Sequence, residues 1–394
     1  MPRLRPRLAV ASIALATLAA CGGFSRYPLS AVAPPTIRVE LGAARESAAL
    51  VIEGAWDCRS EAGRAYASSG QGLVAQVDAT ESGIAVRGTP TGSTTLRFRT
   101  ADTFQLSVGN ARQGYRGDLL VRQEGLKLRF VDEVDLETYV AGVIVHEIGG
   151  GQAPSAYRAQ SVVARSYAYA KWRAAPDAPT HLVDDTRAQV YRGVLVPANA
   201  GVTMAQLERF TAETRGVVLT WRSETFPTYY CSTCGGHTTD PATANLDPGG
   251  ATEPLRGVPC KWCGTSKYYA WTEEVPFERL LAGLRARGVS APLTEISWSK
   301  VGPGGWIGEA TVVCGPKGTK KVVPGPDFRT AAGLRSMHIA SVTPTETGLL
   351  VKGSGWGHGV GMCQVGAQEM ARRGFDEAQI LRWYYPGADF TRLY

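Results

Sequence analysis

The chain has 394 residues, of which 44% are hydrophobic and 20% are charged, and its formal net charge is +7. This length exceeds one typical domain, so two or three modules are expected. The positive charge is mild, whereas a nucleic-acid-binding protein needs a clustered basic face, so no nucleic acid partner is expected.

The first 20 residues have the pattern of an export signal. Three arginines precede an apolar run from Leu8 to Ala20, which is too short to cross a bilayer because a spanning helix takes about 20 residues. The run ends in Leu-Ala-Ala before Cys21, which is typical of a bacterial lipobox, where the signal is removed and the cysteine carries lipid. An ordinary signal peptide with a chance cysteine is the alternative. We expect residues 1–20 to be removed, which lowers the net charge to +4, and Cys21 to anchor the protein to a membrane.

Residues 21–35 predict a lipidated tether, because prolines interrupt a run of small residues. Gly22 follows the cysteine, whereas an aspartate there would indicate retention in the inner membrane, so the periplasmic face of an outer membrane is favoured. From residue 36 to residue 130, short alternating runs such as Thr36–Leu41 and Leu96–Arg99 are separated by glycine and serine clusters. This pattern predicts an N-terminal β-rich region.

Helical periodicity begins after Asp135, a suitable N-cap, and apolar residues recur at helical spacing as far as Ile144. Three glycines from Gly149 are a strong stop signal. A second helix is expected after Pro154, with a face of small residues that permits close packing. Later segments include a β-like run, Gly216–Trp221, a weaker one, Phe226–Tyr230, and two helical stretches, Phe277–Arg287 and Val365–Tyr384.

The expected fold class is α+β and predominantly β, with two packed helices on a β scaffold flanking a groove. Three regions follow the tether. They are the β-rich region 36–130, a core from 131 to 270 with the helices and a cysteine-rich loop, and a C-terminal region, 271–394, that completes the core.

Glu147 is the most informative ionisable residue, because it closes an otherwise apolar helix directly before the glycines. Partial burial there would disfavour the charged form and raise the pKa of the carboxyl group. A raised pKa lets a carboxylic acid protonate a glycosidic oxygen near neutral pH, and the glycines leave room for a bulky sugar chain. A solvated glutamate at a frayed helix end is the alternative.

Five sequence blocks in a fixed order carry a family resemblance. They are Val134–Glu147, Ala159–Ala168, Gln189–Gly193, Ser232–Thr238 and Gly355–Ala367. Together they resemble the SpoIID/LytB family, which is known from sporulation and amidase-modifier proteins. The resemblance covers the chain from about Thr36 to its end.

This resemblance implies a lytic transglycosylase that cleaves peptidoglycan glycan strands between N-acetylmuramic acid and N-acetylglucosamine, with a preference for strands without stem peptides. The groove between the helices would then bind glycan. The family's catalytic glutamate closes a helix of this kind, which assigns the role to Glu147. The chain departs from the family pattern at His146 and Ile148, since the family has a small residue before the glutamate and Met-Pro after it.

Such an enzyme needs only one carboxyl group. Protonated Glu147 would donate to the leaving oxygen, and its carboxylate would then accept a proton from the muramic acid 6-hydroxyl, which closes a 1,6-anhydro ring. Because no water attacks, the second carboxylate of ordinary glycosidases is unnecessary, although Asp184 and Asp185 could lie nearby. No organic cofactor is expected.

Five further residues are candidates for substrate binding. Arg165, on the helix of small residues, could bind a substrate oxygen or carboxylate, or it could pair with a buried acid and lock the fold. Gln189 and Tyr191 have hydrogen-bonding groups suited to sugars, with ordinary strand packing as the alternative. His358 and Gln364 belong to the glycine-rich block, which could line the substrate site or form a tight structural turn.

Two C-x₂-C pairs, separated by about 25 residues, suit a tetrahedral structural zinc site. Their members are Cys231, Cys234, Cys260 and Cys263. The loop between the pairs has little apolar content, so a metal ion would supply order. The resemblance adds His237 as a reserve ligand, because some relatives carry zinc near this segment. One or two disulfides are the alternative, because an exported protein meets an oxidising compartment.

Two other hypotheses belong to different functional classes. The protein could bind peptidoglycan without cleaving it and recruit or enhance a cell-wall amidase, as the LytB name suggests, or it could be a purely structural envelope lipoprotein. The expected partners are therefore glycan strands, a membrane and, if the protein is a recruiter, a cell-wall amidase. Replacement of Glu147 by glutamine separates a catalyst from a recruiter.

Overall fold

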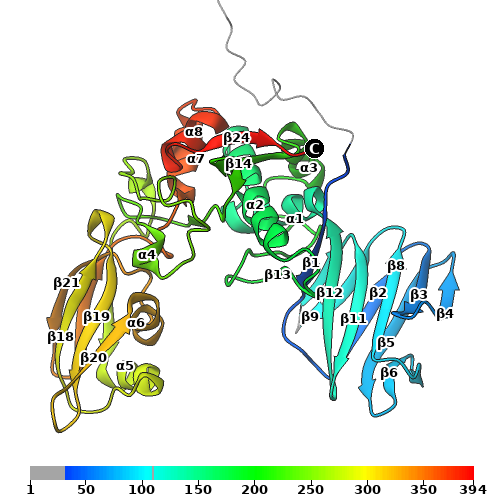
Figure 1. The fold of residues 1–394 in the computed structure, drawn as a ribbon, viewed down its shortest axis with the longest axis horizontal. Coiled ribbons are helices and arrows are strands. Elements are labelled where there is room, and N and C mark those ends of the chain that lie inside the picture. The colour runs from blue at the N-terminus through cyan, green and yellow to red at the C-terminus, as the bar shows by residue number, and fades with distance from the viewer. Residues whose placement is uncertain (1–31, 109–110) are drawn as a thin grey trace, which may run out of the picture.

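The computed structural model describes residues 32–108 and 111–394 (Figure 1). The expected signal peptide and Cys21 lie outside these residues. Several β-sheets accompanied by fewer helices confirm that the fold is α+β and predominantly β. Within the described ranges, no helix combines the length and the apolar character needed to span a membrane.

Two sheets form the N-terminal part of the molecule. One has the strand order β13-β1-β12-β11-β8-β3-β4 and the other β10-β9-β2-β5-β6-β7. Alternate residues are buried in several of the strands, such as β1, where Ile37 and Val39 enter the core, and apolar residues of both sheets share one core. The strands are β1 (Thr36–Glu40), β2 (Ser47–Ile52), β3 (Trp56–Ser60), β4 (Ala65–Ser69), β5 (Leu73–Thr80), β6 (Gly83–Val86), β7 (Thr89–Pro90), β8 (Thr95–Thr100), β9 (Phe104–Val108), β10 (Ala111–Tyr115), β11 (Asp118–Glu124), β12 (Lys127–Asp135) and β13 (Leu182–Val183).

Strand β12 leads directly into the helical part of the same core. Its helices are α1 (Leu136–Ile148), α2 (Pro154–Ala174) and α3 (Met204–Glu213). Asp135 caps α1 by accepting the N–H groups of Glu137 at 3.0 Å and Thr138 at 3.1 Å. Gly149 ends α1 with a φ of 77°, which favours glycine. The helix expected after Asp135 and its glycine stop are thereby confirmed, and α1 is buried along most of its length.

A buried ion pair joins α1 to α2. Arg165 is fully buried, and its Nη2 and Nε lie 2.7 and 2.9 Å from the two carboxylate oxygens of Glu137. The guanidinium also donates to the carbonyl oxygens of Thr211 at 3.2 Å and Val217 at 3.1 Å. Glu137 in turn accepts a hydrogen bond from the hydroxyl group of Tyr394 at 2.7 Å. One charge pair therefore connects both helices, α3, the following strand and the C-terminal residue.

The C-terminal residues return to this first core. A three-stranded sheet has the order β15-β14-β24, and a parallel two-stranded sheet joins β16 to β23 by pairing Tyr230 with Met362 and Cys231 with Cys363. The expected helix Val365–Tyr384 is divided into α7 and α8, because Gly374 adopts a φ of 88° between them. These elements are β14 (Val217–Trp221), β15 (Glu224–Thr225), β16 (Tyr230–Cys231), α4 (Pro241–Ala244), β23 (Met362–Cys363), α7 (Gln364–Arg372), α8 (Glu377–Tyr384) and β24 (Asp389–Arg392).

Residues 271–353 form a second unit with a hydrophobic core of its own. It contains two three-stranded sheets, ordered β17-β22-β21 and β18-β19-β20, and it lies at the opposite end of the molecule from the N-terminal sheets (Figure 1). The expected region 271–394 is thus distributed over two cores, with residues 354–394 in the first. The elements are β17 (Trp271–Pro276), α5 (Phe277–Leu284), β18 (Leu293–Val301), β19 (Ile307–Cys314), β20 (Thr319–Pro324), α6 (Gly325–Ala332), β21 (Ile339–Pro344) and β22 (Gly348–Gly353), with 3-10 turns at Arg285–Arg287 and Pro303–Gly305. A further 3-10 turn, Cys263–Thr265, belongs to the first core.

Arg165→Met is expected to lower the free energy of unfolding by about 3–5 kcal/mol, because it leaves the Glu137 carboxylate buried without its cation. Urea unfolding measures this loss. Arg173→Met on the same helix is the matched control, because its pair with Glu224 is largely exposed and should contribute about 1 kcal/mol or less. Equal losses in the two variants would contradict a fold that depends on the buried pair.

Candidate active site

Glu147 lies in the last turn of α1, with its side chain partly buried. The backbone N–H of Val190 donates a hydrogen bond to Oε1 at 2.5 Å, and the side chains of Tyr230 and Gln364 also hydrogen-bond to the carboxyl group. Burial raises the pKa of Glu147, and these three hydrogen bonds offset the rise only in part. The position combines a fixed orientation with a carboxyl group that holds its proton more strongly than an exposed glutamate does.

Tyr230 is held against Glu147 by a chain of buried polar groups. The Gln189 side chain accepts a hydrogen bond from the Tyr139 hydroxyl at 3.1 Å and donates one to the Tyr230 oxygen at 3.0 Å. Burial raises the pKa of Tyr230 well above its ordinary value, so its hydroxyl stays protonated and can donate to Glu147. Gln189 is fully buried, so it supports the site through Tyr230 and does not reach a surface that a substrate could touch.

Gln364 and His358 approach the carboxyl group from the C-terminal glycine-rich block. Gln364 is the first residue of α7 and contacts Glu147 directly. His358 contacts a neighbour of Glu147: its ring hydrogen-bonds to the backbone of Tyr230, and it packs edge-on against the ring of Tyr229. Burial, with the positive charge of Arg329, lowers the pKa of His358 to about 4, so the imidazole is neutral at neutral pH.

The other two candidate substrate ligands lie elsewhere. Arg165 is committed to Glu137 inside the core, which agrees with the alternative of a fold-locking ion pair. Tyr191 is fully buried, and its hydroxyl donates to Asp132 at 2.7 Å. Asp184 and Asp185 form ion pairs with Arg192 and Arg187, so neither is an unpaired second acid beside Glu147.

Tyr230 is not among the residues predicted from the sequence, although it touches Glu147. It belongs to a strand of only two residues, and its partner strand lies about 130 positions further along the chain. No local periodicity indicates such a pairing. The only sequence signal is its position directly before the first cysteine of the C-x₂-C pairs.

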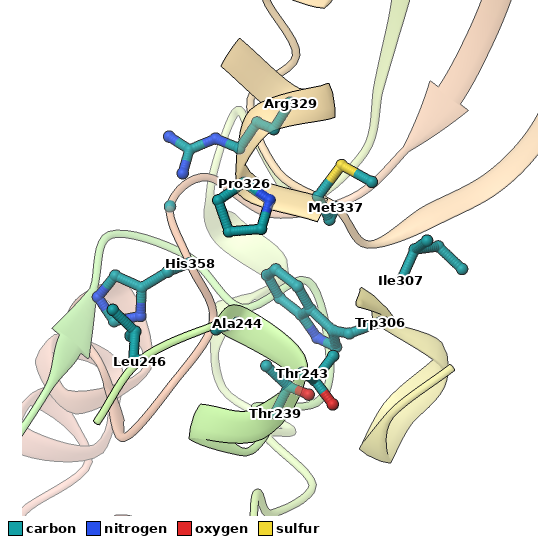
Figure 2. A pocket seen from close by; sticks show the side chains of 11 residues that line it. Thr239, Thr243, Ala244, Leu246, Trp306, Ile307, Pro326, Arg329, Met337 and His358 are labelled. Atoms are coloured by element: carbon teal, nitrogen blue, oxygen red, sulfur yellow. The ribbon is translucent and has the colours of Figure 1, made fainter. Parts of the chain in front are cut away.

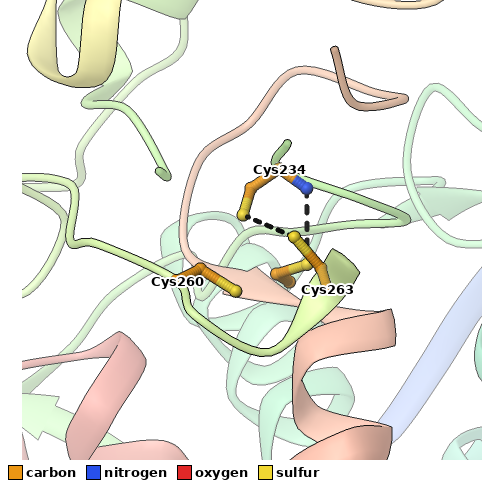
Figure 3. A group of neighbouring side chains, drawn as sticks. Cys234, Cys260 and Cys263 are labelled. Atoms are coloured by element: carbon orange, nitrogen blue, oxygen red, sulfur yellow. Dashed lines mark hydrogen bonds between the residues drawn. The ribbon is translucent and has the colours of Figure 1, made fainter. Parts of the chain in front are cut away.

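Four buried cysteine side chains converge next to this strand (Figure 3). They are Cys234, Cys260, Cys263 and Cys363, whose Sγ atoms all lie within 4.8 Å of one another. The expected set contains Cys231 in place of Cys363, and the parallel pairing of β16 with β23 explains the difference, since it brings Cys363 to the cysteine loop. The Cys231 side chain lies against the backbone at Gly357, and His237 is not a member of the cluster.

The geometry of the cluster suits a metal ion better than disulfide bonds. The Sγ atoms of Cys234 and Cys263 are 3.6 Å apart, whereas a disulfide requires about 2.05 Å. Four sulfurs at about 2.3 Å from a tetrahedral zinc ion would lie about 3.8 Å from one another. All seven cysteines in the described part of the chain have free thiol groups. The donor set therefore fits a closed four-thiolate site.

Comparison with known proteins supports the resemblance found in the sequence. The family model described as SpoIID, Stage II sporulation protein, matches residues 124–221, which include Glu147. Stage II sporulation protein D of Bacillus subtilis is 30% identical over 66% of this chain and 76% of its own length. The chain belongs to the SpoIID/LytB family. An uncharacterized protein of Brachyspira hyodysenteriae is 31% identical over 75% of this chain and 76% of its own length. The amidase enhancer of B. subtilis is 26% identical over 64% of this chain and 40% of its own length.

The pH dependence of stability tests the environment of Glu147. A carboxyl group whose pKa is higher in the folded state binds more protons when folded, so stability falls as the pH rises from the unfolded value of about 4.3 through the raised folded value. Glu147→Gln removes this loss, and we expect the variant to gain thermal stability relative to the wild type as the pH rises from 4 to 8. Glu346→Gln, in an exposed turn, is the control. A stability difference that does not change with pH would rule out the raised pKa.

Proposed function

We propose that this protein is a peptidoglycan lytic transglycosylase that cleaves the bond between N-acetylmuramic acid and N-acetylglucosamine in peptide-stripped glycan strands. Membership of the SpoIID/LytB family supports a role related to the cell wall. The observation that carries the proposal is the carboxyl group of Glu147, which is oriented by three hydrogen bonds and whose pKa is raised by burial. A general acid for glycoside cleavage needs this combination.

In the first step, protonated Glu147 donates its proton to the glycosidic oxygen, and the bond from that oxygen to C1 of the muramic acid breaks. The N-acetylglucosamine leaves with the proton on its 4-hydroxyl group. The N–H of Val190 and the Tyr230 hydroxyl donate hydrogen bonds to the carboxylate that forms. These two oriented donors stabilise its negative charge.

In the second step, the carboxylate of Glu147 accepts the proton of the muramic acid 6-hydroxyl group, and the oxygen of that group bonds to C1. The product is a 1,6-anhydro end, and Glu147 is again protonated. No water is consumed, so a second carboxylate to activate it is not required. The ion pairs of Asp184 and Asp185 are consistent with a mechanism of this kind.

Glu147→Gln is expected to lower the release of anhydro-ended fragments from peptide-free glycan by about 100-fold to 10,000-fold, because the amide cannot exchange the proton. Mass spectrometry of the digest identifies the ends. The exposed Glu346→Gln variant should retain wild-type activity. Hydrated reducing ends in the wild-type digest, or full activity in Glu147→Gln, would exclude the proposed reaction.

A second candidate function has support from the relative named amidase enhancer. In that case the protein binds peptidoglycan and recruits or enhances a cell-wall amidase without cleaving glycan itself. The Glu147→Gln variant distinguishes the two, since a recruiter keeps its effect on the amidase while a catalyst loses its products.

We also propose that the protein is exported and held at the cell envelope by lipid on Cys21, with the periplasmic face of an outer membrane favoured. The support is the charged segment, apolar run and lipobox pattern at the start of the sequence. An anchored enzyme would act on glycan strands within reach of its tether.

The cysteine cluster is proposed to hold a structural zinc ion through Cys234, Cys260, Cys263 and Cys363. Zinc bound by four thiolates has no open position, so its contribution is to fix the loop and β23 and not to bind substrate. Because Gln364 directly follows Cys363, this support extends to a residue that contacts Glu147.

Cys363→Ser is expected to lose most of the zinc and to unfold at a lower temperature, because it removes one of the four ligands. Elemental analysis of the purified protein gives the metal content. Cys231→Ser is the matched control and should retain one zinc ion per chain, since its thiol is buried outside the cluster. Zinc loss in Cys231→Ser alone, or a wild-type protein without zinc, would refute this assignment.

A further inference from the structure

A pocket lies where the second unit meets the first core (Figure 2). Trp306, Ile307 and Met337 form its walls on the side of the second unit, and the other side includes Leu246 and the backbone of the glycine-rich block. The volume is about 190 Å³. Cavities of about 150 Å³ hold a group the size of benzene, and whole drug-sized ligands need about 300 Å³ or more. The pocket therefore suits one substituent of a sugar and not a complete disaccharide.

Arg329 of α6 places a positive charge at the edge of this apolar pocket. In the described part of the chain its guanidinium has no carboxylate partner, and its Nε donates only a long hydrogen bond, of 3.4 Å, to the Leu334 carbonyl oxygen. The acid nearest in sequence, Asp327, is already paired with Arg287. A partly buried guanidinium without a counter-ion, whose planar donors match a carboxylate, is suited to bind an anion.

Two further polar residues, Thr239 and His358, line the pocket. Thr239 is fully buried, and its hydroxyl group has no hydrogen-bond partner among the described residues. His358 accepts the N–H of Val360 at Nδ1, at 3.1 Å, and its other nitrogen is directed to the backbone of Tyr230. The neutral imidazole is therefore already engaged, which leaves Arg329 as the charged group that lines the pocket.

The pocket is separated from Glu147 by a single residue. His358, in the pocket wall, hydrogen-bonds to the backbone of Tyr230, and the Tyr230 hydroxyl hydrogen-bonds to the Glu147 carboxyl group. The wall of the pocket and the candidate acid therefore contact the same residue, His358 at the backbone of Tyr230 and Glu147 at its hydroxyl group.

We propose that the pocket binds the lactyl ether of a peptide-free muramic acid residue, with its carboxylate on Arg329 and its methyl group against the apolar wall. The inference rests on the proposed function and assigns the substrate selectivity of that site to Arg329. In a strand that carries stem peptides the same carboxyl group is an amide, so it has no charge for Arg329, and the attached peptide exceeds the volume of the pocket.

The test compares peptide-free glycan strands with the same strands after conversion of their lactyl carboxylates to neutral methylamides. Affinities are measured with the Glu147→Gln protein and cleavage rates with the wild type. We expect the acidic strands to bind about tenfold to hundredfold more tightly, as for a charged hydrogen bond. Arg329→Met should reduce this ratio to near one, and Arg329→Lys should restore part of it. Arg285→Met, at an exposed position of the same unit, should leave the ratio unchanged.

Each outcome separates this inference from the proposed function. Equal cleavage of both kinds of strand by the wild type, or a folded Arg329→Met protein that keeps its preference, overturns the role of Arg329 and leaves the transglycosylase proposal intact. Preferential binding without cleavage overturns the transglycosylase proposal and supports the pocket. A protein that neither binds nor cleaves either kind of strand overturns both.

Discussion

The buried pair of Arg165 with Glu137 sets the position of the helix on which the candidate site depends. Both charges are removed from water, and the cost of that burial is offset only because each is surrounded by hydrogen-bond partners from α3, β14 and the C-terminal residue. Glu137 lies in the first turn of α1 and Glu147 in the last. Because the first turn of α1 is fixed against α2, the position of Glu147 at the other end of the helix is fixed as well.

At the other end of α1, the environment of Glu147 is assembled from segments that are distant in sequence. Val190, Tyr230 and Gln364 reach one carboxyl group from a loop, a two-residue strand and the start of a helix. The parallel pairing of β16 with β23 brings two of these segments together, and the cysteine cluster lies beside the same pairing. Burial and hydrogen bonding act in opposite directions on the pKa of Glu147, and burial, the larger effect, raises it.

Local sequence signals predicted the local features of this structure. Asp135 and the glycines after Ile148 mark the ends of α1, alternating runs mark β1 and β8, and Glu147 follows from its place at the end of an apolar helix. Features that depend on long-range pairing were not predictable in this way. Cys363 replaces Cys231 in the cluster, and Tyr230 reaches Glu147, because of a strand pairing that has no periodic signal. Arg165 and Tyr191 lie outside the site because they bind the acids Glu137 and Asp132. Each acid is distant in sequence from its partner, so no local pattern predicts these pairs.

The second unit begins and ends at one place, since Trp271 and Gly353 are paired neighbours in adjacent strands. A segment whose two ends meet can be exchanged, enlarged or lost without cutting the chain that surrounds it, much as a loop can. Arg329 and the wall with Trp306 belong to this segment, whereas Glu147 belongs to the part that would remain. The proposed acid and the residue proposed to select the strand are therefore free to diverge independently.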